Sequence, residues 1–196
     1  MSFDLSVALF AEGDSITAGN HTGNVSYATK MAQSPYAGAF YTVVDNAVGS
    51  STVAIMAARA AALDARLPTG GKKGILTVMA GINDYLMAPA VVLTALASYL
   101  DARRAAGWTV VVCTLLPDTA DAGANTFRNT MNTTIRTWAG VHADAVCDMG
   151  ADATMGGDSA PLDTSLYLDG LHPTLLGHTN LAAALWATLA TILQKM

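Results

Sequence analysis

Residues 5–17 read LSVALFAEGDSIT, an apolar run that ends abruptly in a polar turn. A short and nearly continuous apolar run of this kind is typical of a strand that is buried on both faces of a parallel sheet. Four more such runs follow along the chain, separated by longer segments with helical spacing. The five predicted strands are Leu5–Ala11, Tyr41–Val48, Gly74–Ala80, Thr109–Leu116 and Ala145–Met149.

The segments between these runs carry apolar residues at helical spacing. Pro68 and Gly107 mark two helix ends, because proline does not continue a helix and glycine suits the position after its last turn. Strands that alternate with helices predict the α/β class, with a parallel sheet covered by helices on both sides. The predicted helices are Tyr27–Ala39 with an interruption at Pro35, Thr52–Leu67, Pro89–Ala106, Asn125–Trp138 and a last helix that begins at Pro173.

The composition limits the classes of function. The chain has 196 residues, of which 52% are hydrophobic and 13% charged, so we expect one domain over residues 1–196 with a sizeable core. The net charge of −5 argues against nucleic-acid binding. The sequence contains no apolar stretch of about 18 residues, so no membrane span is predicted. Its start lacks a basic region, so no signal peptide is predicted either. We therefore expect a cytoplasmic protein, unless a leader has been removed; the oligomeric state is left open.

The cysteines and histidines do not predict a metal centre. Cys113 and Cys147 lie in apolar runs, which favours two buried free thiols over a disulfide, and leaves the redox compartment open. No histidine or cysteine cluster has the spacing of metal ligands, so no metal or other cofactor is expected. His21 is interpreted as a solvated loop residue, with a place at the mouth of the functional site as the alternative, and His178 as a packing or solvent-exposed residue of the last helix.

Four polar clusters follow or flank the predicted strands. In open parallel sheets, ligands bind outside the carboxyl ends of the strands. Because those ends share one edge, we expect the four clusters to lie together on one rim. The clusters are Glu12–Thr17, Gly49–Thr52, Gly81–Asp84 and Asp169–Pro173.

The residue types in these clusters suit nucleophilic catalysis on an ester. Ser15 is the candidate nucleophile, His172 the base that would take its proton, and Asp169 the acid that would orient the imidazole. Acyl transfer also needs donors for the oxyanion. The Ser15 backbone N–H, the Gly49 backbone N–H and the Asn83 side-chain amide are the candidates. Each residue also has a purely structural interpretation: Ser15, Asn83 and Asp169 as capping residues, and Gly49 as a turn glycine.

At these residues the chain resembles the SGNH, or GDSL, hydrolase superfamily. The resemblance implies a three-layer α/β/α sandwich with a five-stranded, flavodoxin-like sheet. Its second block is shorter here than is common in the family, since Asn46 and Gly49 are three residues apart. The helix Arg128–Arg136 is similar to the one that follows the fourth strand in lysophospholipase-like and carbohydrate-esterase members. The matching blocks are Gly13–Thr17 with the nucleophile, Gly49 with the oxyanion glycine, Gly81–Asp84 with the asparagine and Asp169–Pro173 with the acid and base.

The expected function is that of a serine esterase which forms an acyl-enzyme on Ser15. The loops Pro117–Asn125 and Gly150–Leu166 are polar, and the chain leaves no room for a lid domain. These features favour short acyl chains, including O-acetyl groups on carbohydrate, in a small ester substrate. The alternatives are a lysophospholipase- or thioesterase-type acyl hydrolase, and a carbohydrate-binding module whose site is inert.

Overall fold

The structure is a computed structural model that describes residues 6–196, so Leu5 of the first predicted strand lies outside the described residues. Five strands form one sheet in which every neighbouring pair is parallel. This confirms the predicted α/β class. The strands are β1 (Val7–Gly13), β2 (Thr42–Asp45), β3 (Lys73–Met79), β4 (Thr109–Cys113) and β5 (Ala145–Cys147).

The strand order, β2-β1-β3-β4-β5, is the flavodoxin-like order that the family resemblance implies. The chain first moves outward from β1 to β2, and then crosses back to place β3 on the other side of β1. Loops that leave the carboxyl ends of β1 and β3 therefore diverge at a switch point, where ligands bind in sheets of this kind. Every residue of β1 is buried, which explains the unbroken apolar run at the start of the chain.

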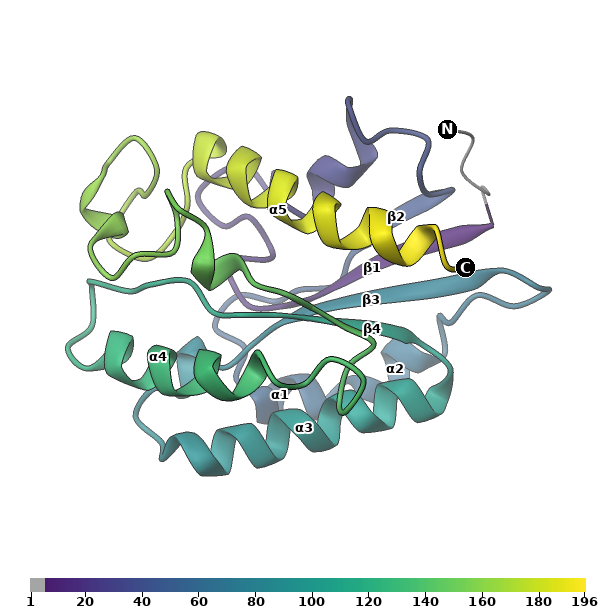
Figure 1. Ribbon diagram of the computed structural model, residues 1–196, viewed down its shortest axis with the longest axis horizontal. Helices are drawn as coiled ribbons and strands as arrows, with labels where there is room; N and C mark the ends of the chain where they lie inside the picture. Colours follow the sequence, from purple (N-terminus) through teal and green to yellow (C-terminus); the bar gives the residue numbers. More distant parts are fainter. Residues whose placement is uncertain (1–5) are drawn as a thin grey trace.

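Helices cover both faces of the sheet, and this gives the expected three layers (Figure 1). One face carries α5 (Leu175–Leu193) together with the 3-10 helix η1 (Thr29–Ala32). Four helices pack on the opposite face, and three further 3-10 turns lie in loops. The four helices are α1 (Val53–Ala58), α2 (Ala60–Asp64), α3 (Pro89–Ala106) and α4 (Ala124–Ile135); the turns are η2 (Ile82–Asp84), η3 (Met149–Ala151) and η4 (Ala160–Leu162).

Several predicted boundaries are wrong. The predicted helix Thr52–Leu67 is divided at Arg59, whose backbone leaves helical geometry (φ −102°, ψ 4°) and whose side chain donates to Glu12 of β1. The last helix begins after Pro173, because Thr174 is its N-cap and accepts a hydrogen bond from the Gly177 amide at 3.1 Å. The predicted helix Tyr27–Ala39 is reduced to η1. β2, β4 and β5 end before the predicted strands do.

The core bears on two predictions, the state of the two cysteines and the absence of a membrane span. Cys113 and Cys147 are buried and free, as predicted, and they face each other as Cα partners of β4 and β5. Within residues 6–196, α5 is the one helix whose length and composition would also suit a bilayer. Its inner face, which includes Leu181 and Leu185, is fully buried in the core. That burial is what a core helix requires, and the absence of a membrane span stays a prediction.

Candidate active site

Ser15, His172 and Asp169 form one line of hydrogen-bonded side chains at the carboxyl edge of the sheet. His172 Nε2 lies 2.8 Å from Ser15 Oγ, and His172 Nδ1 lies 2.8 Å from Asp169 Oδ2. The side chain of His172 is only 14% exposed, whereas that of Asp169 is 45% exposed. The structure therefore brings together the three residues that the sequence proposed as nucleophile, base and orienting acid.

The turn before α5 holds Asp169 in place for this contact. Asp169 Oδ1 accepts hydrogen bonds from the backbone amides of Leu171, at 3.1 Å, and His172, at 2.8 Å. Partial burial by itself would raise the pKa of Asp169, but the hydrogen bonds from the His172 amide and ring and the Leu171 amide outweigh it. The pKa of this carboxyl is held below its usual value, so the group is ionised and can accept from the imidazole.

A tight turn after β1 places Ser15. A side chain at Gly13 would lie 2.3 Å from Thr17 Oγ1 and 2.6 Å from the Met79 carbonyl, so only glycine fits this close approach. Asp14 is fully buried, and its Oδ1 accepts from the Ile16 amide at 3.0 Å. These contacts fix the turn from within, and they leave the Ser15 hydroxyl partly exposed above the sheet.

Asn83 lies on the same edge, in η2 directly after β3. Its Nδ2 donates one hydrogen bond to the Ser51 carbonyl at 3.0 Å. An amide nitrogen has two hydrogens, so this contact orients the group and leaves the second hydrogen for a ligand. Ser51 was not singled out in the sequence, because its role in holding Asn83 arises only when the loops after β2 and β3 meet.

Gly49 lies against the loop that follows Ser15. A Cβ at Gly49 would lie 2.7 Å from Asn20 Nδ2, so a larger residue would displace that side chain. The backbone N–H of Asn20 donates to the Ser15 carbonyl at 3.0 Å. Asn20 is therefore a second neighbour of the site that the sequence did not reveal, since only the fold brings the loops after β1 and β2 together.

His21 also lies at the site, which the sequence offered as the alternative to a solvated loop residue. Its side chain is exposed, but its ring centroid is 4.8 Å from that of His172, with the planes inclined at 58°. Nitrogen and oxygen ligand atoms of His21, Asp169 and His172 lie within 4.8 Å of one another. The prediction that no cluster has the arrangement of metal ligands considered spacing along the chain, and this group forms only in three dimensions.

Helix α4 supports the loops around the site. Arg128 is buried and donates to the Leu115 carbonyl at 3.1 Å, to the Gly156 carbonyl and to Asp158 at 2.7 Å. Asn132 accepts from the Leu115 amide at 2.7 Å. Through these contacts the helix joins the end of β4 to the long loop that leads towards Asp169.

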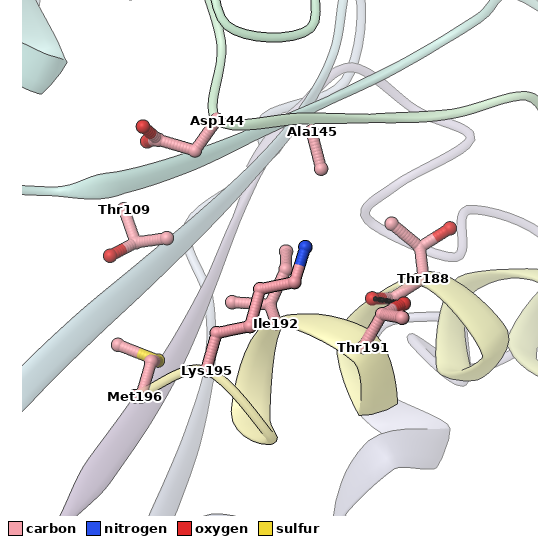
Figure 2. Close-up of a pocket in the computed structure, with 8 residues that line it drawn as sticks. All are labelled: Thr109, Asp144, Ala145, Thr188, Thr191, Ile192, Lys195 and Met196. Carbon is pink, nitrogen blue, oxygen red and sulfur yellow. Dashed lines mark hydrogen bonds between the residues drawn. The ribbon is translucent and has the colours of Figure 1, made fainter.

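Two pockets differ in their distance from the triad. A pocket of about 530 Å³ adjoins it and is lined by His21, Thr22, Ser165, Leu168, Thr174, Leu175 and Leu176. The second, of about 380 Å³, lies where β4 and β5 begin, beside the end of α5 (Figure 2). The Asp144 carboxylate on its wall is already bound by the Val110 amide at 2.7 Å and by Arg104 at 3.2 Å. This second pocket is at the amino edge of the sheet, opposite the triad.

A serine, a histidine and an aspartate joined in this way, at the carboxyl edge of a parallel sheet, are the arrangement of a hydrolase that acts on esters. The chain belongs to the GDSL-like Lipase/Acylhydrolase family, whose model matches residues 11–179. This confirms the resemblance found in the four sequence blocks. No curated protein sequence matches the chain.

Solved structures of similar fold cover nearly the whole chain. The structure of TesA is 23% identical, with a TM-score of 0.72, and the match covers 93% of this chain and 97% of that one. The psychrotrophic esterase EstA from Pseudoalteromonas sp. is 15% identical, with a TM-score of 0.71 and coverages of 95% and 98%. A variant of Axe2, an acetylxylan esterase from Geobacillus stearothermophilus, is 16% identical, with a TM-score of 0.70 and coverages of 95% and 95%. At these identities the likeness establishes the fold alone.

Proposed function

We propose that the protein hydrolyses carboxylic esters through an acyl-enzyme on Ser15. The observation that carries this proposal is the 2.8 Å contact between Ser15 Oγ and His172 Nε2, on an imidazole whose other nitrogen lies 2.8 Å from Asp169. A serine hydroxyl is a weak nucleophile unless a base takes its proton. The orientation that Asp169 imposes leaves Nε2 as the acceptor.

In the first step Ser15 Oγ bonds to the ester carbonyl carbon while His172 Nε2 takes the hydroxyl proton. The carbonyl oxygen becomes an oxyanion, for which the Ser15 and Gly49 amides and the free hydrogen of Asn83 are the candidate donors. The tetrahedral intermediate collapses, the bond to the alcohol oxygen breaks, and His172 gives the proton to that alcohol. In the second step His172 takes a proton from water while the water oxygen bonds to the acyl carbon. The bond between that carbon and Ser15 Oγ then breaks, His172 returns the proton to Ser15 Oγ, and the carboxylic acid is released.

Among esters, short acyl chains are the favoured substrates, including O-acetyl groups on carbohydrate. The loop after β4 is polar, and it packs on the Asp169–His172 turn through a 2.9 Å hydrogen bond from the Thr119 amide to the Gly170 carbonyl. The acetylxylan esterase among the structures of similar fold agrees with this choice.

One observation favours a second candidate, a thioesterase- or lysophospholipase-type acyl hydrolase. The pocket beside the triad is lined by Leu168, Leu175 and Leu176, whose side chains are 48%, 53% and 52% exposed. Exposed leucines in a pocket can take up a longer alkyl chain, and each CH₂ buried there contributes about 0.8 kcal/mol. A series of p-nitrophenyl esters separates the two candidates. We expect the highest kcat/KM with acetate or butyrate, whereas a maximum at octanoate or longer would support the second.

The role of Ser15 is tested with a fluorophosphonate probe and with p-nitrophenyl acetate. We expect the probe to label Ser15, as located by mass spectrometry, and Ser15→Ala to lower kcat about 10⁴-fold or more. Ser98→Ala is the matched control, because Ser98 is an exposed serine whose hydroxyl only contacts its own helix, at the Thr94 carbonyl. Turnover by Ser15→Ala at the wild-type rate contradicts the proposal. A protein that binds acetylated sugar but neither reacts with the probe nor turns over ester would instead be an inert carbohydrate-binding module.

A further inference from the structure

We propose that His21, Asp169 and His172 form a binding site for a divalent transition-metal ion such as Zn²⁺, and that the bound ion reversibly blocks the triad. The binding itself is independent of the proposed esterase function. Only the inhibition rests on that function. One ligand of the site, His21, lies outside the triad. Metal binding can therefore be weakened by a substitution at His21 without removing a group that the reaction needs.

The ligand set is chemically suited to such an ion. Two imidazoles and one carboxylate are donors that Zn²⁺ prefers, and a water molecule can complete a tetrahedral shell. The ligand atoms of the three side chains lie within 4.8 Å of one another. Ligands of a tetrahedral Zn²⁺ are about 3.3 Å apart, given metal–ligand distances of roughly 2.0–2.2 Å. His21 is exposed, so its side chain is free to rotate towards the other two ligands.

The backbone holds His21 near the triad. His21 has a φ of 68°, in the left-handed region that few residues other than glycine and asparagine adopt. The Gly19 carbonyl fixes the loop by accepting from the Thr22 amide at 3.1 Å, the Thr22 hydroxyl at 2.7 Å and the Asn24 amide at 3.2 Å. Within residues 6–196 no side-chain hydrogen bond engages the His21 ring, so both ring nitrogens are available.

Occupation of this site disables His172 whichever of its nitrogens binds the ion. An ion on Nε2 takes the lone pair that should accept the Ser15 proton. An ion on Nδ1 forces the ring proton onto Nε2, which then donates and cannot accept. It also displaces the 2.8 Å contact with Asp169. The inhibition is therefore expected to be complete at saturation and to be reversed when a chelator removes the ion.

The choice of ion distinguishes this site from a non-specific effect of charge. Mg²⁺ and Ca²⁺ prefer shells made of oxygen ligands, which one carboxylate and two imidazoles do not provide. Zn²⁺, Ni²⁺ and Cu²⁺ bind imidazole well, and of the three Cu²⁺ generally has the highest affinity. We expect Zn²⁺ and Cu²⁺ to inhibit at concentrations where Mg²⁺ has no effect.

The chain offers a matched control. His142 Nδ1 lies 3.0 Å from Asp101 Oδ2, with side chains that are 30% and 50% exposed. This pair is also a histidine beside an aspartate on the surface, but no third ligand residue joins it among the described residues. His21→Asn and His142→Asn therefore remove one exposed imidazole each, and asparagine tolerates the left-handed backbone at position 21.

The test measures binding and inhibition separately on the full chain. ZnCl₂ is titrated by calorimetry into wild type, His21→Asn, His142→Asn and Ser15→Ala. We expect one tight site in all of them except His21→Asn, where the affinity falls roughly 10-fold or more, since even losing an outer partner of a metal ligand costs about that much. Thermal melting of the metal-free proteins checks that each variant is folded.

Inhibition of p-nitrophenyl acetate hydrolysis is then measured against ZnCl₂, with each variant normalised to its own metal-free rate. We expect His142→Asn to match wild type, His21→Asn to need about 10-fold more ion, and EDTA to restore the rate. Equal affinity in wild type and His21→Asn overturns the proposal, as does the absence of a tight site in wild type. If Zn²⁺ binds with the expected dependence on His21 but no protein hydrolyses ester, the metal site stands and the proposed esterase function fails.

Discussion

His172 Nε2 lies 2.8 Å from Ser15 Oγ, although 157 residues separate the two in the chain. Ser15 reaches this position at the end of β1, and His172 reaches it from the turn before α5. β1 lies inside the sheet and α5 packs on one of its faces, so a change in that packing would alter the distance between base and nucleophile. A catalytic contact held by two rigid elements is better defined than one between mobile loops.

Asp169→Asn tests the orienting role of the carboxylate. The asparagine oxygen can still accept from the Leu171 and His172 amides, but its NH₂ group would donate to His172 Nδ1 and favour the tautomer that cannot accept the Ser15 proton. We expect kcat for p-nitrophenyl acetate to fall about 10⁴-fold with little change in folding. Asp163→Asn is the control, since Asp163 accepts from the Ser165 amide in a similar turn without a histidine partner. A loss below about 10-fold would mean that Asp169 only shapes its turn.

Asn83→Ala tests the oxyanion donor. The Asn83 amide is oriented by its 3.0 Å hydrogen bond to the Ser51 carbonyl, and its second hydrogen is the candidate contact to the oxyanion. We expect kcat to fall about 10²–10³-fold, which is the usual cost of losing one such donor, while KM changes little. Steady-state kinetics with p-nitrophenyl acetate provide both constants. An unchanged kcat would remove Asn83 from the oxyanion site.

Arg59→Ala tests the buried ion pair behind the site. Glu12 is fully buried, and Arg59 Nε donates to its carboxylate at 3.0 Å while Nη1 donates to Ser51 at 2.8 Å. Removing the guanidinium would leave the buried Glu12 carboxylate without its counter-charge, with the Asn46 side-chain amide as its remaining donor, so we expect the free energy of unfolding to fall by about 3–5 kcal/mol. Urea unfolding measures the change. Arg104→Ala is the control: its pair with Asp144 is about one-third exposed on both sides, and we expect a loss of about 1 kcal/mol or less.

Asp14 should make the stability depend on pH. Burial raises the pKa of Asp14 to about 6, despite a hydrogen bond from the Ile16 amide, and the nearby charge of Asp84 adds to the increase. In the unfolded chain an aspartate titrates near pH 3.9, so between about pH 4 and 6 the folded state holds more protons at this group. Its contribution to stability is therefore present at low pH and is lost as the pH rises through about 6. The loss amounts to roughly 3 kcal/mol.

Asp14→Asn removes this ionisation, and urea unfolding at several pH values isolates its effect. We expect the difference in unfolding free energy between variant and wild type to shift in favour of the variant as the pH rises from about 4 to about 7. Comparing the two proteins cancels the contributions of the other carboxyl groups, including Glu12, whose pKa burial also raises. A difference that does not change with pH would show that Asp14 titrates in the folded protein as it does in the unfolded chain.

The sequence predicted the sheet better than the helix boundaries. β1, β3 and β4 are runs of apolar residues that are buried almost throughout, so their positions could be read from local composition, whereas β2 is only half-buried. Helix α3 was predicted with its observed bounds, because Pro89 and Gly107 mark its ends. The helix predicted over Thr52–Leu67 failed at Arg59, since nothing local indicates that this side chain must turn inward to meet Glu12.

In the candidate site, too, contacts that are local in the sequence could be predicted, and contacts between different loops could not. The relation of Asp169 to His172 is local, because residues three apart in a turn can contact each other, and His172 Nδ1 lies 2.8 Å from Asp169 Oδ2. The supporting roles of Asn20 and Ser51 and the approach of His21 to His172 depend on contacts between different loops. Periodicity and turn chemistry describe neighbours along the chain, so they could not find the roles of Asn20 and Ser51, and they offered His21 at the mouth of the site only as an alternative.

For Ser15 and its partners, the sequence by itself determined which groups are present and at which edge of the sheet they emerge. Apolar runs decide where strands form, and parallel strands deliver their following loops to one rim whatever the other details. Only the tertiary structure decided the distances: the 2.8 Å contacts of His172 and the place of His21 against its ring. Those distances depend on how α5 and the loops after β1, β2 and β3 pack together, which is a property of the whole core rather than of any one segment.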